Sequence, residues 1–120
     1  MNRKIKFRGK SLNTGLWSYG DLQQDNIRRK AYVEYEVDPK TIGQFTGLTD
    51  CKGKEIYEGD IIEGRGFRHI VEDDAKQARF SAKNINEPRD DGSSITQQWI
   101  DECEKVVIGN IYDNPEIIKR

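Results

Sequence analysis

The acidic residues with the strongest claim to chemistry lie between Val37 and Ile62. Four carboxylates in this stretch stand beside turn signals, namely Asp38, Glu55, Glu58 and Asp60. Such a cluster could bind a divalent metal or serve as a general acid and base. Aspartate is also a common turn residue, because its side chain accepts hydrogen bonds from nearby backbone N–H groups. No nucleophile or base accompanies the four at a suitable spacing. We therefore expect the two aspartates to stabilise turns and the two glutamates to be exposed at strand edges, and a metal-dependent enzyme is the least favoured function.

The glycines, the histidine and the cysteines offer weaker candidates. The nearest string to a phosphate-binding loop is Gly53-Lys54-Glu55, which lacks the hydroxyl residue that should follow the lysine. His69 falls in an apparent strand with no serine or cysteine at a recognisable spacing. Cys51 and Cys103 share no metal-ligand spacing, so we expect two reduced thiols. We predict no catalytic residue, no cofactor and no metal site.

Basic residues near the amino terminus are candidate contacts to nucleic acid. They are Arg3, Lys4, Lys6, Arg8, Lys10, Arg28, Arg29 and Lys30. The first five precede or enter an expected strand, and those at even positions share one face of it. With Trp17 and Tyr19 in the same expected hairpin, this face is similar to the nucleic-acid surface of a small β-barrel. The alternative is a solvated face or an edge strand protected by lysines, and a formal net charge of −1 favours that alternative.

Composition leaves two readings of the surface. The hydrophobic fraction of 34% is low for a compact monomer. Either segments such as Gln23–Lys30 and Asn84–Ser93 are exposed loops, or apolar surface is shared between subunits. The first reading is favoured, and homo-oligomerisation stays open. No signal-peptide pattern follows Met1–Lys10 and no apolar stretch could span a membrane, so we expect a cytoplasmic protein without a membrane partner.

Strand signals run through most of the chain. Ile5–Arg8 and Leu16–Leu22 predict an amino-terminal hairpin. Ala31–Val37 alternates most strictly and predicts one continuous strand. The residues expected on its apolar face are Ala31, Val33, Tyr35 and Val37. Turns that separate short central strands are expected at Asp38-Pro39, Asp50–Gly53 and Glu58-Gly59-Asp60.

One helix is expected near the carboxyl terminus. Ser94 to Gln97 match a capping box with Ser94 as the N-cap, and an apolar stripe follows at helical spacing. Val106–Tyr112 then predicts a buried strand. The predicted fold is mainly β, with short antiparallel strands in one or two small barrel-like, SH3-like sheets and one short helix. We expect a single domain over residues 1–120, with two β subdomains of about 1–64 and 65–120 as a further option.

Three blocks of the sequence carry a family resemblance. They are Ile5-Lys6-Phe7-Arg8, Val37 to Ile62 with its VDPKTIGQFTGL and GKEIYEGDII strings, and Ile108 to Glu116, IGNIYDNPE. In these blocks the chain resembles the YopX family of phage and prophage proteins, whereas Arg65–Lys105 matches loosely. The resemblance implies a mostly β fold, a homo-oligomer and a phage or prophage origin in a host bacterium. It implies no biochemical activity. We expect a non-enzymatic oligomeric binding module, with a nucleic-acid-binding β domain as the alternative.

Overall fold

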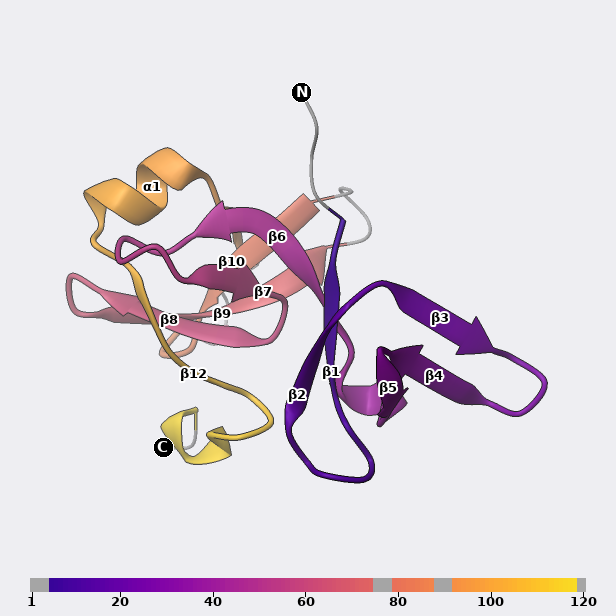
Figure 1. Cartoon of the computed structure of the whole chain (residues 1–120). Helices are drawn as coiled ribbons and strands as arrows, with labels where there is room; N and C mark the ends of the chain where they lie inside the picture. Colours follow the sequence, from indigo (N-terminus) through magenta and orange to yellow (C-terminus); the bar gives the residue numbers. More distant parts are fainter. Residues whose placement is uncertain (1–4, 75–78, 88–91, 119–120) are drawn as a thin grey trace. The chain divides into compact units, whose positions relative to one another are not determined.

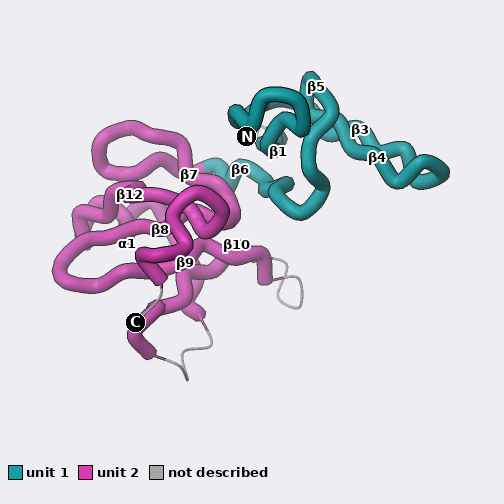
Figure 2. Tube along the Cα trace, turned by 90° about the horizontal axis from the view of Figure 1, so that it is seen from below, with its two compact units in different colours: residues 1–47 teal, residues 48–120 magenta. Residues whose placement is uncertain are grey.

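The structure is a computed structural model that describes residues 5–74, 79–87 and 92–118. It confirms a mainly β protein, with antiparallel strands in three sheets and one short α-helix (Figure 1). The described strands form open sheets, so the expected barrel is not closed. The chain divides into unit 1, residues 1–47, and unit 2, residues 48–120 (Figure 2). This boundary lies earlier than the subdomain boundary expected near residue 64.

Unit 1 contains two small layers of strands. Its elements are β1 Phe7–Lys10, β2 Trp17–Gly20, β3 Leu22–Asp25, β4 Lys30–Val33, β5 Tyr35–Val37, η1 Pro39–Thr41 and the start of β6 Gly43–Thr49. β1 pairs with β2 and β6, which confirms the amino-terminal hairpin, and β3, β4 and β5 form a separate sheet. The core consists of Ala31, Val33 and Val37, with partly buried neighbours around them. Gly9 allows the backbone of β1 to lie close to Val37, because a Cβ at this position would be only 2.9 Å from a Val37 methyl.

The structure corrects two sequence predictions in unit 1. The predicted single strand Ala31–Val37 is a tight hairpin of β4 and β5, which reverses at Glu34 with a φ of 66°. Ala31, Val33 and Val37 are buried as expected, but Tyr35 is exposed because the reversal moves it off the shared face. The predicted loop Gln23–Lys30 contains most of strand β3. Its residues are polar, so no apolar alternation marked it as a strand.

Unit 2 contains the larger sheet and the helix. Its elements are β7 Glu55–Tyr57, β8 Asp60–Gly64, β9 Phe67–Asp74, β10 Arg79–Asn84, β11 Ser93–Ser94, α1 Gln97–Glu102, β12 Val106–Asn110 and η2 Pro115–Ile117. Five strands form one antiparallel sheet in the order β11-β10-β9-β8-β12, and β7 ends the order β2-β1-β6-β7. The core cluster is Ile56, Ile62, Val71 and Ile100, with Leu48, Ile95, Trp99 and Val107 packed against it.

The helix exists, but the predicted capping box is wrong. Thr96 is the N-cap, and its side chain accepts a hydrogen bond from the Trp99 N–H at 3.1 Å. Ser94 lies in β11 instead, opposite Ser81 of β10. Gln97 has another role, because its side chain bonds to both the N–H and the C=O of Thr49. Competition from strand pairing therefore moved the start of the helix two residues along the chain.

Two predicted features lie partly or wholly outside the described residues. Asn84 ends strand β10, so the predicted surface loop Asn84–Ser93 begins later than expected, and residues 88–91 lie outside the described part. Arg3 and Lys4 also lie outside it. Within the described residues, no helix is long and apolar enough to cross a membrane.

Candidate functional site

Asp38 and Asp60 of the central stretch both accept hydrogen bonds from backbone N–H groups. Asp38 accepts a hydrogen bond from the Lys40 N–H at 3.0 Å, and Asp60 accepts one from the Tyr57 N–H at 2.7 Å. These contacts confirm that both are turn residues. A carboxylate that stabilises a turn in this way has fewer lone pairs left for a metal ion or a substrate.

The two glutamates of the same stretch are half-buried, which corrects the expectation that they are exposed. Glu55 Oε1 accepts a hydrogen bond from the Tyr57 hydroxyl at 3.1 Å. The residues that the structure describes contain no group of three or more His, Cys, Asp or Glu side chains arranged to hold a metal ion.

Asp50 accepts hydrogen bonds from three backbone N–H groups, although its position in the sequence indicated only the start of a turn. Its Oδ1 accepts the N–H groups of Lys52 and Lys54, both at 2.9 Å. Its Oδ2 accepts the N–H of Val107 in β12 at 3.0 Å. Burial alone would raise the pKa of Asp50, but the three backbone donors outweigh it and hold the pKa below its ordinary value. Asp50 therefore ties the β6–β7 turn to β12.

Lys105 is a buried cation that no local sequence pattern indicated. Its side chain is only 1% exposed, and its Nζ donates to the carbonyl oxygens of Gly64 at 2.8 Å and Phe67 at 3.2 Å. The Nζ also lies 5.3 Å from the centre of the Trp99 ring. Burial lowers the pKa of Lys105. The bonding partners are turn carbonyls of β8 and β9, so we assign Lys105 a structural role.

The first group of basic candidates lies against aromatic rings. The guanidinium carbon of Arg8 is 4.5 Å from the centre of the Trp17 ring, and the Lys10 Nζ is 5.6 Å from the same centre. The Lys6 Nζ is 5.3 Å from the centre of the Phe45 ring. Cation–π contacts of this kind stabilise the hairpin itself. Arg8 is only 5% exposed, which leaves it little surface for a ligand.

The second group of basic candidates lies in the turn between β3 and β4. Arg28 and Arg29 are exposed, and Lys30 Nζ is 3.9 Å from a Glu36 carboxylate oxygen. The turn is well defined, because Asp25 Oδ1 accepts the N–H groups of Ile27 and Arg28 at 3.1 and 3.2 Å. The expected basic surface is therefore an aromatic-backed face on β1 and a separate exposed turn.

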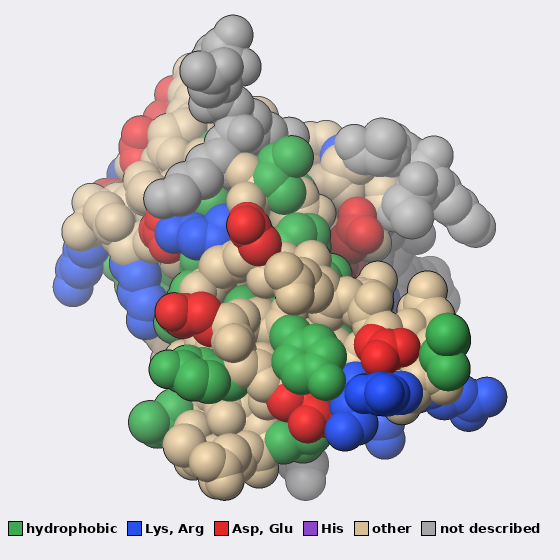
Figure 3. Space-filling view, turned by 45° about the vertical axis from the view of Figure 1, so that its right-hand side comes forward, with side chains coloured by type: hydrophobic (Ala, Val, Ile, Leu, Met, Phe, Trp, Pro, Cys, Tyr) green, Lys and Arg blue, Asp and Glu red, His purple; other side chains and the backbone are tan. Residues whose placement is uncertain are grey.

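Exposed apolar side chains gather in unit 1. Among the described residues, the large ones are Ile5, Leu12, Leu16, Tyr19, Ile27 and Tyr35 in unit 1 and Phe67 in unit 2. Ile27 is 95% exposed, at the tip of the β3–β4 turn. Figure 3 shows hydrophobic side chains at separate points of one face, among acidic and basic ones. Exposed apolar side chains next to charged ones are candidate contacts to another protein.

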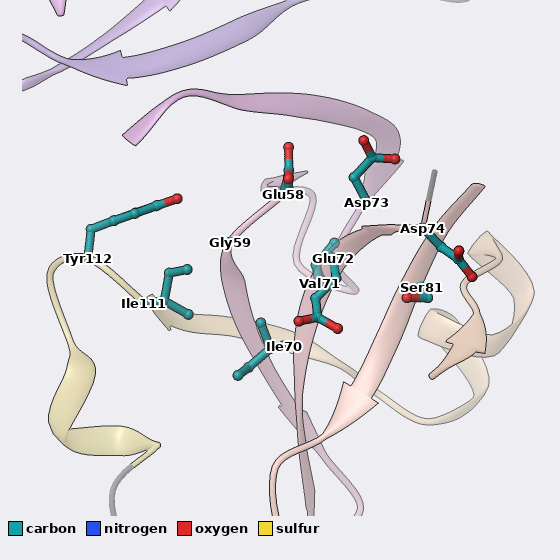
Figure 4. Close-up of a pocket in the computed structure, with 10 residues that line it drawn as sticks. All are labelled: Glu58, Gly59, Ile70, Val71, Glu72, Asp73, Asp74, Ser81, Ile111 and Tyr112. Atoms are coloured by element: carbon teal, nitrogen blue, oxygen red, sulfur yellow. The ribbon is translucent and has the colours of Figure 1, made fainter. Parts of the chain in front are cut away.

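Unit 2 has a pocket of about 420 Å³ beside β9. Its lining includes the carboxylates of Glu58, Glu72, Asp73 and Asp74 around an apolar part formed by Ile70, Val71 and Ile111. Figure 4 shows the four acidic side chains spread around the pocket rather than directed at one point. Asp74 also accepts from Arg79 Nε at 3.3 Å. The negative lining makes this pocket unfavourable for nucleic acid or phosphate.

Comparison with protein-family models gives one decisive result. The YopX protein family model matches residues 6–119, which is nearly the whole chain. The chain belongs to the YopX family. Its predicted family membership is thereby confirmed, and the match includes the Arg65–Lys105 region that looked divergent in sequence.

The solved structures include a similar fold. The crystal structure of protein EF1440 from Enterococcus faecalis matches with a TM-score of 0.68 and 23% sequence identity. The alignment covers 98% of this chain and 100% of that one. At this identity the likeness establishes the fold. A comparison with curated proteins finds no match.

Proposed function

We propose that this YopX-family chain is a non-enzymatic binding module that works as a homo-oligomer. In this proposal it is a phage or prophage accessory protein in the cytoplasm of its host bacterium. The observation that carries the proposal is the concentration of large exposed apolar side chains in unit 1. Covering apolar surface is favourable by about 25 cal/mol per Å², so a partner surface that covers these side chains would stabilise an assembly.

The polar groups of the chain support a binding role over a catalytic one. The carboxylates of Asp38, Asp50 and Asp60 all accept hydrogen bonds from backbone N–H groups in turns. Lys105 is likewise bonded to two backbone carbonyl oxygens. Each of these groups has a stated structural task, and such a task accounts for its residue type without any reaction.

Two measurements test the proposal. Sedimentation velocity over a wide range of protein concentration should show an assembly larger than the monomer. Addition of magnesium, manganese or calcium should leave the thermal unfolding midpoint unchanged, since a metal that binds only the folded state would raise it. A protein that stays monomeric throughout, or one that a divalent metal stabilises, would contradict the proposal.

A nucleic-acid-binding β domain is the second candidate. The observation in its favour is the exposed pair Arg28 and Arg29 on an ordered turn. Binding through phosphate contacts would weaken steeply with salt. Fluorescence anisotropy with labelled single-stranded and double-stranded DNA and RNA at low salt tests it. Lack of binding to all of these probes would remove this candidate and leave the first one standing.

A further inference from the structure

The sheet β3-β4-β5 has two edges that differ in how they are covered. The β5 edge lies against the β1–β2 connection: Leu12 N–H donates to Glu36 C=O at 3.1 Å, and Asp38 N–H donates to Lys10 C=O at 2.9 Å. Ser11 and Val37 also form an isolated β-bridge. β3 is the other end of the sheet, and none of the described strands pairs with its outer side.

The β3 edge is short, at four residues, but it lacks most of the other features that prevent strands from pairing between molecules. Natural edges carry lysine, proline, a bulge or a covering segment. The sequence of β3 is Leu22-Gln23-Gln24-Asp25, and it has neither lysine nor proline. Its register with β4 runs through all four residues without a shift, so no bulge twists the edge away. Alternate residues of such an edge direct N–H and C=O groups outward.

The segment around β3 is complementary to itself when two copies run antiparallel. Its centre is the pair Gln23-Gln24, whose amides both donate and accept hydrogen bonds. An exposed acid, Asp21, precedes the strand. Its last residue, Asp25, has a carboxylate oxygen 3.9 Å from Arg28 Nε, and the exposed cation Arg29 follows that pair. An antiparallel arrangement places the beginning of one strand beside the end of the other. The acid Asp21 of each copy would then lie near the basic turn of the other copy.

We infer that the β3 edge pairs antiparallel with the β3 edge of a second copy around a two-fold axis. This inference rests on the proposed function and names its partner as the same chain. The two copies form a continuous sheet in the order β5-β4-β3-β3-β4-β5. Both copies contribute the same residues, as a two-fold interface requires. The β3–β4 hairpin extends away from β1 and β2, which leaves room beside it within unit 1 (Figures 1 and 2).

The short length of β3 limits the affinity of this dimer. Four residues and one turn per copy cover less surface than a standard interface, which buries roughly 1,600 Å² in total. The dimer should therefore be reversible and depend on protein concentration. Gln23 and Gln24 lie opposite each other at the centre, so charges of one sign placed there would oppose each other directly.

The test compares self-association of the full chain and its variants by sedimentation velocity. The double variant Gln23→Lys/Gln24→Lys gathers four cations at the two-fold axis and should raise the dimer dissociation constant by about tenfold or more. The matched control is Asn13→Lys/Gln98→Lys, which makes the same charge change at exposed positions away from β3. Its dissociation constant should stay close to that of the unmodified chain. Thermal unfolding of each variant verifies that it folds.

A charge exchange tests the antiparallel arrangement independently. Asp21→Arg and Arg29→Asp should each weaken the dimer, and the combination of the two should restore it. Loss of association in the lysine variant with restoration by the exchange supports the inference. An unmodified chain that is monomeric overturns both this inference and the oligomeric function. An oligomer that the lysine pair weakens no more than its control, or that the exchange does not restore, overturns the inference alone.

Discussion

Unit 1 and unit 2 use their apolar residues in opposite ways. Unit 2 buries a contiguous cluster around Ile62, Val71 and Ile100, and Phe67 is its only large exposed apolar side chain among the described residues. Unit 1 has a core cluster of Ala31, Val33 and Val37 with Phe45 also buried, and its described residues include six large exposed apolar side chains. Burial drives folding, whereas displayed apolar surface is available for association. We therefore expect unit 2 to supply most of the stability, and in the proposal above unit 1 supplies the contact surface.

The polar contacts of the two units involve different kinds of groups. Unit 2 contains Asp50 and Lys105, each with several backbone partners from separate elements. These contacts join segments far apart in the chain and make the unit rigid. In unit 1, the cations Lys6 and Lys10 lie over aromatic rings near the surface. The buried Thr41 joins separate segments of unit 1, because its hydroxyl oxygen accepts the Lys10 N–H at 2.9 Å and donates to the Asp38 C=O at 2.7 Å.

The largest expected effect comes from a matched pair of core truncations. Val71→Ala in unit 2 should cost about 2–3 kcal/mol of the free energy of unfolding, because its rigid surroundings cannot close the cavity. Val33→Ala removes the same atoms from unit 1 and should cost less, since the smaller core can relax. Urea denaturation of both variants measures the difference. A larger loss for Val33→Ala would reverse the comparison between the units.

Removal of the buried cation should have the next largest effect. Lys105→Met keeps the apolar stem but leaves the carbonyl oxygens of Gly64 and Phe67 without their donor, at a cost of about 1–3 kcal/mol. Lys52→Met is the control, because its side chain is exposed and its change should stay within about 0.5 kcal/mol. Thermal and urea unfolding measure both variants. Equal effects at the two positions would show that the buried contacts contribute little.

The contribution of Asp50 to stability should depend on pH. Its pKa is lowered in the folded state, so its stabilisation is complete above the unfolded-state pKa of about 3.9 and is lost as pH falls through the folded-state value. Asp50→Asn should cost about 1–2 kcal/mol at neutral pH, because an amide accepts less strongly than a carboxylate. The difference in thermal unfolding midpoint between the Asp50→Asn variant and the unmodified chain should narrow as pH falls from 6 toward 3. A gap that is constant with pH would assign the loss to packing.

The smallest effect on stability is expected at the exposed turn. Ile27→Ala should change the free energy of unfolding by less than about 0.5 kcal/mol, because the side chain is 95% exposed. The same change should weaken self-association several-fold. Phe67→Ala in unit 2 serves as the control and should leave association unchanged. Analytical ultracentrifugation measures both variants, and equal effects on association would contradict a contact surface confined to unit 1.

Turns were the part of the fold that local sequence predicted well. Asp38-Pro39, Asp50 to Gly53 and Gly59-Asp60 all occur as turns, and Gly53 and Gly59 both have positive φ. The residue types at these places act on their immediate neighbours, so a single sequence contains the relevant information. Alternating apolar residues are likewise a local pattern, and they were sufficient to predict the mainly β class.

Features that depend on distant segments were missed. The positive φ of Glu34 divides one apparent strand in two, and nothing in its side chain signals this. Strand β3 is polar because neither of its faces is buried along its length: Leu22 and Asp25 are half-buried and Gln23 and Gln24 are exposed, so it lacked a hydrophobic period. Lys105 reads as an ordinary surface lysine until the chain brings Gly64, 41 positions away, to its Nζ. The candidate contact surface could not be predicted, since exposure is a property of the folded chain.

Hydrogen exchange measured at low and high protein concentration tests most directly whether unit 1 carries the contact. Backbone amides of β3 and the turn to Arg29 should become more protected as concentration rises, because pairing covers the open edge. Ser93-Ser94, the edge strand β11 of the unit 2 sheet, is the internal control and should exchange at a constant rate. Protection that rises at β11 but not at β3 would contradict the assignment of the contact surface to unit 1.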